Sequence, residues 1–152
     1  CLLYNILKIR SFGIMRSKKI IVTDKYIDQN GHVGEAGYLS MAIDALWEFN
    51  KEIGLSKKYL ETSCAPVTFS TQIDYQNEVF QKEEIEFRLE NIGQPDDERK
   101  WVRQIRLFKK SGDLAVKIVA HGAWFNLSSR KVIAPPKELK NLFEEFIGDP
   151  IQ

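Results

Sequence analysis

One stretch of the chain holds most of the side chains that could carry out chemistry. It runs from Tyr26 to Leu39 with the sequence YIDQNGHVGEAGYL, in which an acid, Asp28, and a histidine, His32, precede a segment with helical periodicity. The first N–H groups of a helix have no partner inside it, and the helix dipole adds positive potential there. Such amides can stabilise a carbonyl oxygen that becomes negative during acyl transfer. Asp28 could then act as the nucleophile or as a general base on water.

Three glycines in this stretch, Gly31, Gly34 and Gly37, would let a ligand approach the backbone closely. The same residue types also have a purely structural interpretation, because Asp, Asn and Gly are frequent in turns and at helix N-caps. Composition alone favours that interpretation. A single histidine such as His32 is likewise more often a hydrogen-bonded structural residue than a catalyst.

Other kinds of catalytic or metal site lack their residues in this sequence. The two histidines, His32 and His121, and the two cysteines, Cys1 and Cys64, have a spacing that fits no zinc site. No nucleophilic-serine, phosphate-loop or dinucleotide-binding motif occurs. His121 stands in an apolar segment, so we expect it in the core or at an interface. We expect no metal and no redox cofactor.

Hydrophobic periodicity predicts the elements that position the 26–39 stretch. In residues 35–53 apolar side chains recur at three- and four-residue spacing, which predicts a long helix ended by Gly54. In residues 83–91 apolar and charged side chains alternate, which is the period of a half-buried strand. A helical turn is predicted at 56–61 and a short amphipathic helix from Pro135. Strands are predicted at 18–26, 66–75, 83–91, 99–109 and 114–127.

This order of elements predicts an α+β fold. An antiparallel sheet of about five strands would wrap around one long central helix, with a short C-terminal helix after it. One helix cannot cover both faces of such a sheet, and apolar edge strands favour pairing with a second copy. We therefore expect a homodimer, with a homotetramer as the larger alternative.

Length, charge and cysteine content limit the function further. The 152 residues fit one domain, and a net charge of +1 argues against nucleic acid as a partner. Residues 1–10 are far shorter than the roughly 20 apolar residues of a membrane span, so we expect no membrane partner. Few cysteines indicate a reducing compartment and predict a cytoplasmic location. We expect residues 1–14 to be an extension outside the core and residues 15–152 to form the domain.

The motif DxxGHV that begins at Asp28, followed by Tyr38-Leu39 on the predicted helix, resembles the acyl-CoA thioesterases of the hotdog fold. It is most similar to their 4-hydroxybenzoyl-CoA thioesterase-like branch. The resemblance covers roughly residues 18–139 and includes the IDY segment at 73–75 and the Pro-Pro pair at 135–136. It implies the hotdog fold, hydrolysis of an acyl-CoA thioester, and Asp28 as the catalytic carboxylate.

The resemblance also implies roles for the residues around Asp28. Backbone N–H groups at Gly34 and Glu35 would polarise the thioester carbonyl. CoA would enter as part of the substrate, so that no separate cofactor is needed. Basic pairs at 109–110 and 130–131 could meet the nucleotide end of CoA. The residues expected to contact the substrate are Asn30, Gly31, His32 and Tyr38.

Two positions depart from the family pattern. Tyr26 stands where the family often has a second Asp, and Gly34-Glu35 stands where Asn-Asn often follows. The variant is also similar to thioesterases that act on betainyl-CoA, which implies that Glu35 could face a cationic acyl group with Trp47 or Tyr38 as an aromatic wall. The alternatives are a first-turn acid that complements the helix dipole and aromatic residues that pack in the core. A non-catalytic hotdog module that binds an acyl thioester or a partner is the rival of another class.

Overall fold

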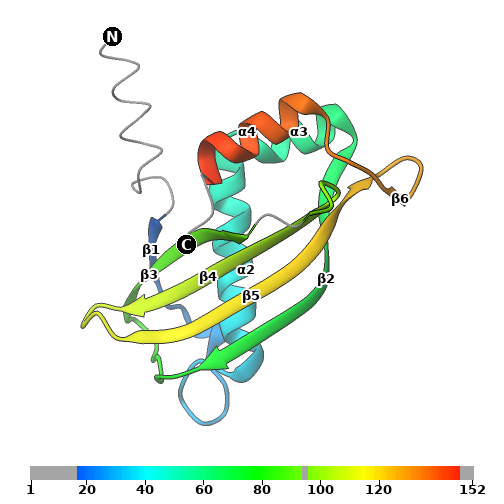
Figure 1. Cartoon of the computed structure of the whole chain (residues 1–152). Helices are drawn as coiled ribbons and strands as arrows, with labels where there is room; N and C mark the ends of the chain where they lie inside the picture. Colours follow the sequence, from blue (N-terminus) through cyan, green and yellow to red (C-terminus); the bar gives the residue numbers. More distant parts are fainter. Residues whose placement is uncertain (1–16, 94–95, 148–152) are drawn as a thin grey trace.

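The computed structural model describes residues 17–93 and 96–147 (Figure 1). The described strands form one antiparallel sheet in the order β1-β3-β4-β5-β2, with the short β6 beside β5. The expected extension at residues 1–14 lies outside the described residues. The strands are β1 (Ser17–Ile21), β2 (Cys64–Tyr75), β3 (Glu84–Gly93), β4 (Lys100–Lys109), β5 (Leu114–Asn126) and β6 (Lys131–Val132). The helices are the 3-10 helix η2 (Asp24–Tyr26), α2 (Glu35–Glu52), α3 (Leu55–Thr62) and α4 (Lys137–Ile147).

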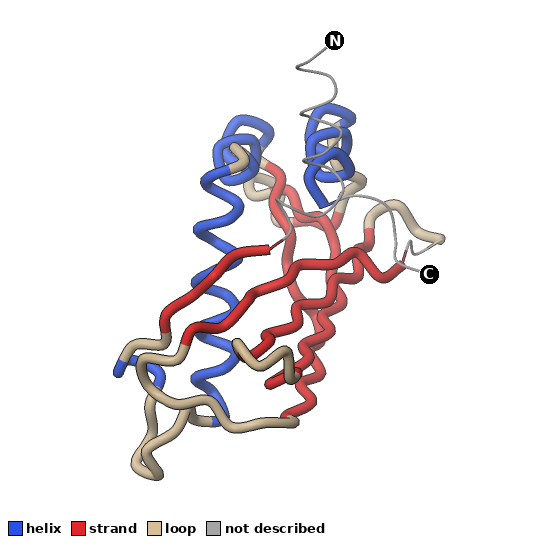
Figure 2. The backbone as a smooth tube through the Cα atoms, turned by 90° about the vertical axis from the view of Figure 1, so that its left-hand side faces the viewer, coloured by secondary structure: helices blue, strands red, loops and turns tan. Residues whose placement is uncertain are grey.

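The long helix α2 forms where the periodicity predicted it. Its buried face carries Met41, Ala42, Ala45 and Phe49, which recur at three- and four-residue spacing and join the main hydrophobic core. The helix ends at the C-cap Ile53, and the following glycine, residue 54, has a φ of 81°, a left-handed conformation that favours glycine. Figure 2 shows α2 along one side of the strands, with α3 and α4 at one end of the sheet.

The sheet also confirms the alternation seen in the sequence. Ile85, Phe87 and Leu89 of β3 are all buried and belong to the same core as α2. A curled antiparallel sheet on one long central helix, followed by a short C-terminal helix, is the hotdog fold expected from the sequence. None of the described helices is long and apolar enough to cross a membrane.

Two local expectations need correction. The strand predicted at 18–26 ends at Ile21, and η2 follows it, because the Tyr26 hydroxyl donates a hydrogen bond to Asp44 of α2 and draws this segment toward the helix. His121 is exposed, because its neighbours Ala120 and Gly122 take the buried positions of β5; it does not lie in the core, and its place at an interface stays a prediction. The two-residue β6 was not expected from the sequence and pairs with the end of β5.

Candidate functional site

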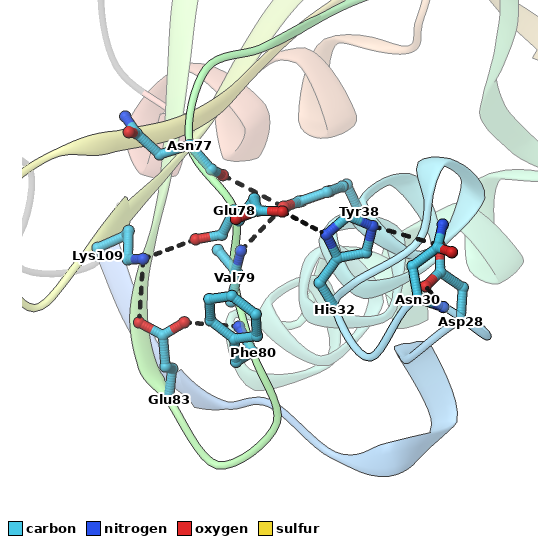
Figure 3. A network of polar contacts seen from close by, with 10 residues as sticks. All are labelled: Asp28, Asn30, His32, Tyr38, Asn77, Glu78, Val79, Phe80, Glu83 and Lys109. Atoms are coloured by element: carbon cyan, nitrogen blue, oxygen red, sulfur yellow. Dashed lines mark hydrogen bonds and ion pairs between the residues drawn. The ribbon is translucent and has the colours of Figure 1, made fainter.

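The loop before α2 is a tight turn built around Asp28. The Asp28 carboxylate accepts a hydrogen bond of 2.8 Å from the Asn30 N–H, and the Asp28 backbone N–H donates to the His32 carbonyl at 2.9 Å. Gly31 has a φ of 83°, which explains a glycine at this point of the turn. Asn30 and Gly31 therefore shape the loop, and the Asp28 side chain stays partly exposed beside the start of the helix (Figure 3).

Two glycines allow this loop to lie directly on the first turn of α2. A Cβ atom at residue 34 would lie 3.0 Å from the Cβ of Asp28, and a Cβ atom at residue 37 would lie 2.5 Å from the Tyr26 carbonyl oxygen. Larger side chains at Gly34 or Gly37 would push the loop away. The glycines thus bring the Asp28 carboxylate against the helix N-terminus.

The N-terminus of α2 keeps unused hydrogen-bond donors. Its N-cap, Gly34, offers no side chain that could bond the first turn. Among the described residues, no acceptor bonds the backbone N–H groups of Glu35, Ala36 or Gly37, whereas the Tyr38 N–H bonds the Gly34 carbonyl. These amides and the helix dipole favour a negative oxygen at this point.

His32 lies between two carboxylates (Figure 3). Its Nδ1 is 2.8 Å from Glu78 Oε1, and its Nε2 is 3.6 Å from Asp28 Oδ2. The first distance is that of a hydrogen bond and the second that of an ionic contact. The imidazole therefore joins Asp28 to the segment that follows β2.

Tyr38 fastens α2 to that same segment. Its hydroxyl donates to the Asn77 carbonyl at 3.2 Å and accepts from the Val79 N–H at 3.1 Å. Burial raises the pKa of Tyr38, which suits a hydroxyl that acts as a neutral structural group. A second tyrosine, Tyr75 of β2, donates its hydroxyl hydrogen at 2.8 Å to the carbonyl of Glu35, which lies one turn before Tyr38 on α2. Both tyrosines anchor the first turn of α2.

A cavity of about 420 Å³ opens beside this helix end. Three of the residues expected at the site, His32, Glu35 and Tyr38, line it together. Asp28 and Gly34 are not among its lining residues; Asp28 reaches the cavity through its contact with His32. The remaining lining residues are Val33, Tyr75, Gln76, Asn77 and Glu78.

The basic and aromatic residues considered from the sequence divide between different places. Lys109 joins the site network, because its Nζ lies 2.6 Å from the Glu78 carbonyl oxygen and 3.3 Å from Glu83 Oε1. Arg130 belongs to the exposed turn before β6, and Figure 1 shows β6 away from the start of α2. Trp47 is 50% exposed and lines a second cavity farther along α2. Trp47 is therefore not a core residue, and within one chain it does not line the cavity that contains Glu35.

Glu78 was missed in the sequence. It follows β2 in a polar stretch, and its partner His32 is 46 residues away, so that no local pattern marks it. Only the IDY segment at 73–75 indicated that the end of this strand belongs with the site. In the described part of the chain, no three His, Cys, Asp or Glu side chains cluster as metal ligands.

Comparison with protein families gives one match. The model of the thioesterase-like superfamily matches residues 22–143, which include the Asp28 loop, α2 and the four long strands that follow the helix, β2 to β5. No sequence match to a curated protein was found.

Solved structures with the same fold share little sequence with this chain. The hypothetical protein SAV2348 from Staphylococcus aureus, in complex with CoA, has 21% identity and a TM-score of 0.78, covering 90% of this chain and 87% of that one. The probable thioesterase YbaW from Escherichia coli has 17% identity and a TM-score of 0.72, covering 87% and 98%. Slr0204, a 1,4-dihydroxy-2-naphthoyl-CoA thioesterase from Synechocystis, has 15% identity and a TM-score of 0.70, covering 83% and 93%.

Proposed function

The chain belongs to the thioesterase-like superfamily, and from this premise we propose that it hydrolyses an acyl-CoA thioester to a free acid and CoA. One observation carries the proposal: the Asp28 carboxylate lies against Gly34, at a helix end whose first amides have no acceptor among the described residues. A carboxylate next to unused amide donors is what attack on a thioester carbonyl requires.

In the proposed reaction the thioester oxygen binds the amides of the first turn of α2, at Glu35 and the two residues after it. Asp28 then attacks the carbonyl carbon directly, or it takes a proton from a water molecule that attacks. His32 positions the Asp28 carboxylate and is itself held by Glu78. In both routes the negative charge develops on the thioester oxygen at the start of α2, so the arrangement of Asp28 and the amides is compatible with either one.

Two observations support the binding of CoA. SAV2348, which shares the fold, was determined in complex with CoA. In this chain Lys109 already neutralises Glu83 at the site, while Lys110 is exposed one residue further on. We assign to Lys110 the contact with the phosphates of CoA, since its exposed charge can pair with them and such a contact would weaken as the salt concentration rises. The 4-hydroxybenzoyl-CoA-like branch is the first acyl class to test.

The proposed enzyme is a homodimer, with a homotetramer as the larger alternative. Among the described strands, β2 pairs only with β5, so its other edge is open. Phe69, near the middle of β2, is 63% exposed. An open edge with an exposed aromatic side chain favours pairing with a second copy of the same strand.

A cationic acyl group is the second candidate, and the cavity itself favours it. Glu35 and Glu78 both line the cavity, together with the rings of Tyr38 and Tyr75. The two rings meet edge to face with centroids 5.5 Å apart. Acidic side chains next to aromatic faces are suited to a quaternary ammonium such as that of betainyl-CoA.

A free-thiol assay tests the proposal and separates it from a non-catalytic binding module. The substrates are short-chain, long-chain, 4-hydroxybenzoyl- and betainyl-CoA. We expect Asp28→Asn to lower the rate of thiol release at least about 100-fold, because it removes the nucleophile or base but keeps the shape. Asp24→Asn, which changes an exposed acid in η2, is the matched control and should stay near wild type. Thioester binding without turnover by the wild-type protein would instead favour the module.

A further inference from the structure

A second cavity, of about 200 Å³, lies at the opposite end of α2 from the Asp28 site. Asn50 lines it and is 16 residues beyond Gly34, which is about 24 Å along the helix at 1.5 Å per residue. It is lined by the second half of α2, by α3 and α4, and by β2, β3 and β4 of the sheet. Most of its lining residues are apolar, among them Leu46, Trp47 and Trp101.

Four polar side chains line this otherwise apolar cavity. Asn50, Tyr59 and Arg103 come from α2, α3 and β4, and Thr68 comes from β2. Asn50 is 6% exposed and Tyr59 is 4% exposed, and neither side chain forms a hydrogen bond with the described residues. Among those residues the one fully buried side-chain polar atom without a partner is Ser56 Oγ, so the polar atoms of Asn50 and Tyr59 are open to the cavity and can bond a ligand there.

Arg103 is the one charged residue of this wall. Its guanidinium stacks on the Trp101 ring at 4.9 Å, and no carboxylate of the described residues lies within 4 Å of it. Two other arginines of the sheet differ in this respect, since Arg88 pairs with a glutamate on its own strand and Arg106 pairs with Glu90. Burial lowers the pKa of Arg103, which shows the cost of holding this cation without an anion.

We propose that this cavity binds a small carboxylate with a compact apolar body, such as a single aromatic ring, whose anionic group is held by Arg103. A guanidinium receives a carboxylate through two parallel hydrogen bonds, and Tyr59 and Asn50 can donate further ones. The size fits, because an apolar cavity of about 150 Å³ binds benzene and one of 200 Å³ leaves room for one added carboxylate.

Benzoate and benzamide are the matched probes, since they have the same shape and differ in charge. Trp47 and Trp101 line the cavity, so that binding can be followed by tryptophan fluorescence and checked by calorimetry. We expect benzoate to bind the wild-type protein at least about tenfold more tightly than benzamide. Equal affinity for the two probes, or no binding of benzoate at millimolar concentration, would overturn the proposal.

Substitutions locate the site. Arg103→Met keeps the length of the side chain and should lower benzoate affinity about tenfold or more, with no change for benzamide. Lys100→Gln removes a charge from an exposed position of the same strand and should leave both affinities unchanged. Tyr59→Phe removes one donor and should weaken benzoate several-fold. Unchanged benzoate binding in both Arg103→Met and Tyr59→Phe would place the ligand elsewhere and reject the assignment.

The carboxylate could reach the cavity as a free acid or as part of a larger ligand. Steady-state kinetics with an acyl-CoA that the protein hydrolyses, measured with and without benzoate, separate these sources. Benzoate that raises the KM without changing kcat would show that the cavity takes a carboxylate carried by the substrate in addition to its thioester. Benzoate that binds without raising the KM would show a free acid at a separate site. Because fluorescence reads binding and not turnover, a protein without thioesterase activity would still test the cavity. Failure of the proposed hydrolysis is therefore distinguishable from failure of the cavity proposal.

Discussion

The Tyr75 hydroxyl donates a hydrogen bond of 2.8 Å to the backbone carbonyl of Glu35. This contact ties the last residue of β2 to the first residue of α2, 40 positions earlier. The amides that we propose as donors to the thioester oxygen belong to the same turn. A side chain at the end of a strand therefore fixes the direction in which the helix presents these amides.

We predict that Tyr75→Phe lowers kcat/KM about three- to tenfold, because the first turn of α2 loses its tether and the amides lose their orientation. The free energy of unfolding should fall by only about 1 kcal/mol, since the hydroxyl is partly exposed and one hydrogen bond is lost. Steady-state kinetics and urea unfolding measure the two effects. A variant with wild-type kcat/KM would show that this contact does not orient the donors.

Glu78 should act as a positioning residue through His32. Its carboxylate accepts from, or pairs with, His32 Nδ1 at 2.8 Å, while the opposite ring nitrogen faces Asp28. We predict that Glu78→Ala lowers kcat about tenfold with a smaller change in KM, because the imidazole is then free to turn away from Asp28.

Two comparisons separate positioning by Glu78 from a general loss of structure. Glu78→Gln keeps an acceptor oxygen for His32 and should restore most of the kcat. Glu84→Ala changes an acid of β3 whose nearest cation is Lys19 at 3.9 Å, outside the network, and should behave as wild type. If Glu78→Gln and Glu78→Ala lost kcat equally, the negative charge and not the position of His32 would be what matters.

The segment that leads into the Asp28 loop is held by Asp44 of α2. Asp44 Oδ2 accepts from the Tyr26 hydroxyl at 2.5 Å and from Lys25 Nζ at 2.8 Å. The hydrogen bond from Lys25, followed by that from Tyr26, lowers the pKa of Asp44. A lowered folded-state pKa means that the ionised carboxylate stabilises the protein above its ordinary pKa and that this contribution is lost as the pH falls through the lower value.

We therefore predict that Asp44→Asn is less stable than wild type by about 1 kcal/mol at neutral pH, a modest figure because the side chain is nearly half exposed. The difference should shrink toward zero as the pH falls below the ordinary Asp pKa of about 3.9 and then through the lower folded-state value, because the wild-type carboxylate is then protonated as well. Urea unfolding across this range measures it, with Asp24→Asn as the exposed control. A difference that stays constant with pH would mean that the charge of Asp44 does not carry the effect.

Much of the fold could be predicted from the sequence because its signals are local. The alternation of Ile85, Phe87 and Leu89 depends on strand geometry alone, and the apolar face of α2 depends on helical periodicity. The residue types at 22–26 favour extended structure and predict strand. The contact between Tyr26 and Asp44, 18 residues apart, decides otherwise, and single-sequence propensity does not register such contacts.

The site shows the same division. The DxxGHV motif located Asp28 and the helix end, because loop and helix are adjacent in the chain. Glu78 and Tyr75 come to the site through the pairing of β2 with β5, which no local pattern encodes. The exposure of Trp47 likewise depends on how far the curled sheet reaches along α2, and helical periodicity describes only the direction in which a side chain points.

The open edge of β2 gives the last prediction. Phe69 falls where the pairing of β2 with β5 shifts register, between Thr68 and Ser70, and its side chain is exposed. If two copies pair across this edge, Phe69→Asp brings two like charges near the two-fold axis and should convert a dimer to a monomer. Leu60→Asp changes an apolar residue on α3 that is even more exposed, at 76%, and should leave the dimer intact. Sedimentation equilibrium at several concentrations measures both variants. A wild-type monomer, or a Phe69→Asp dimer as stable as wild type, would contradict association through this edge.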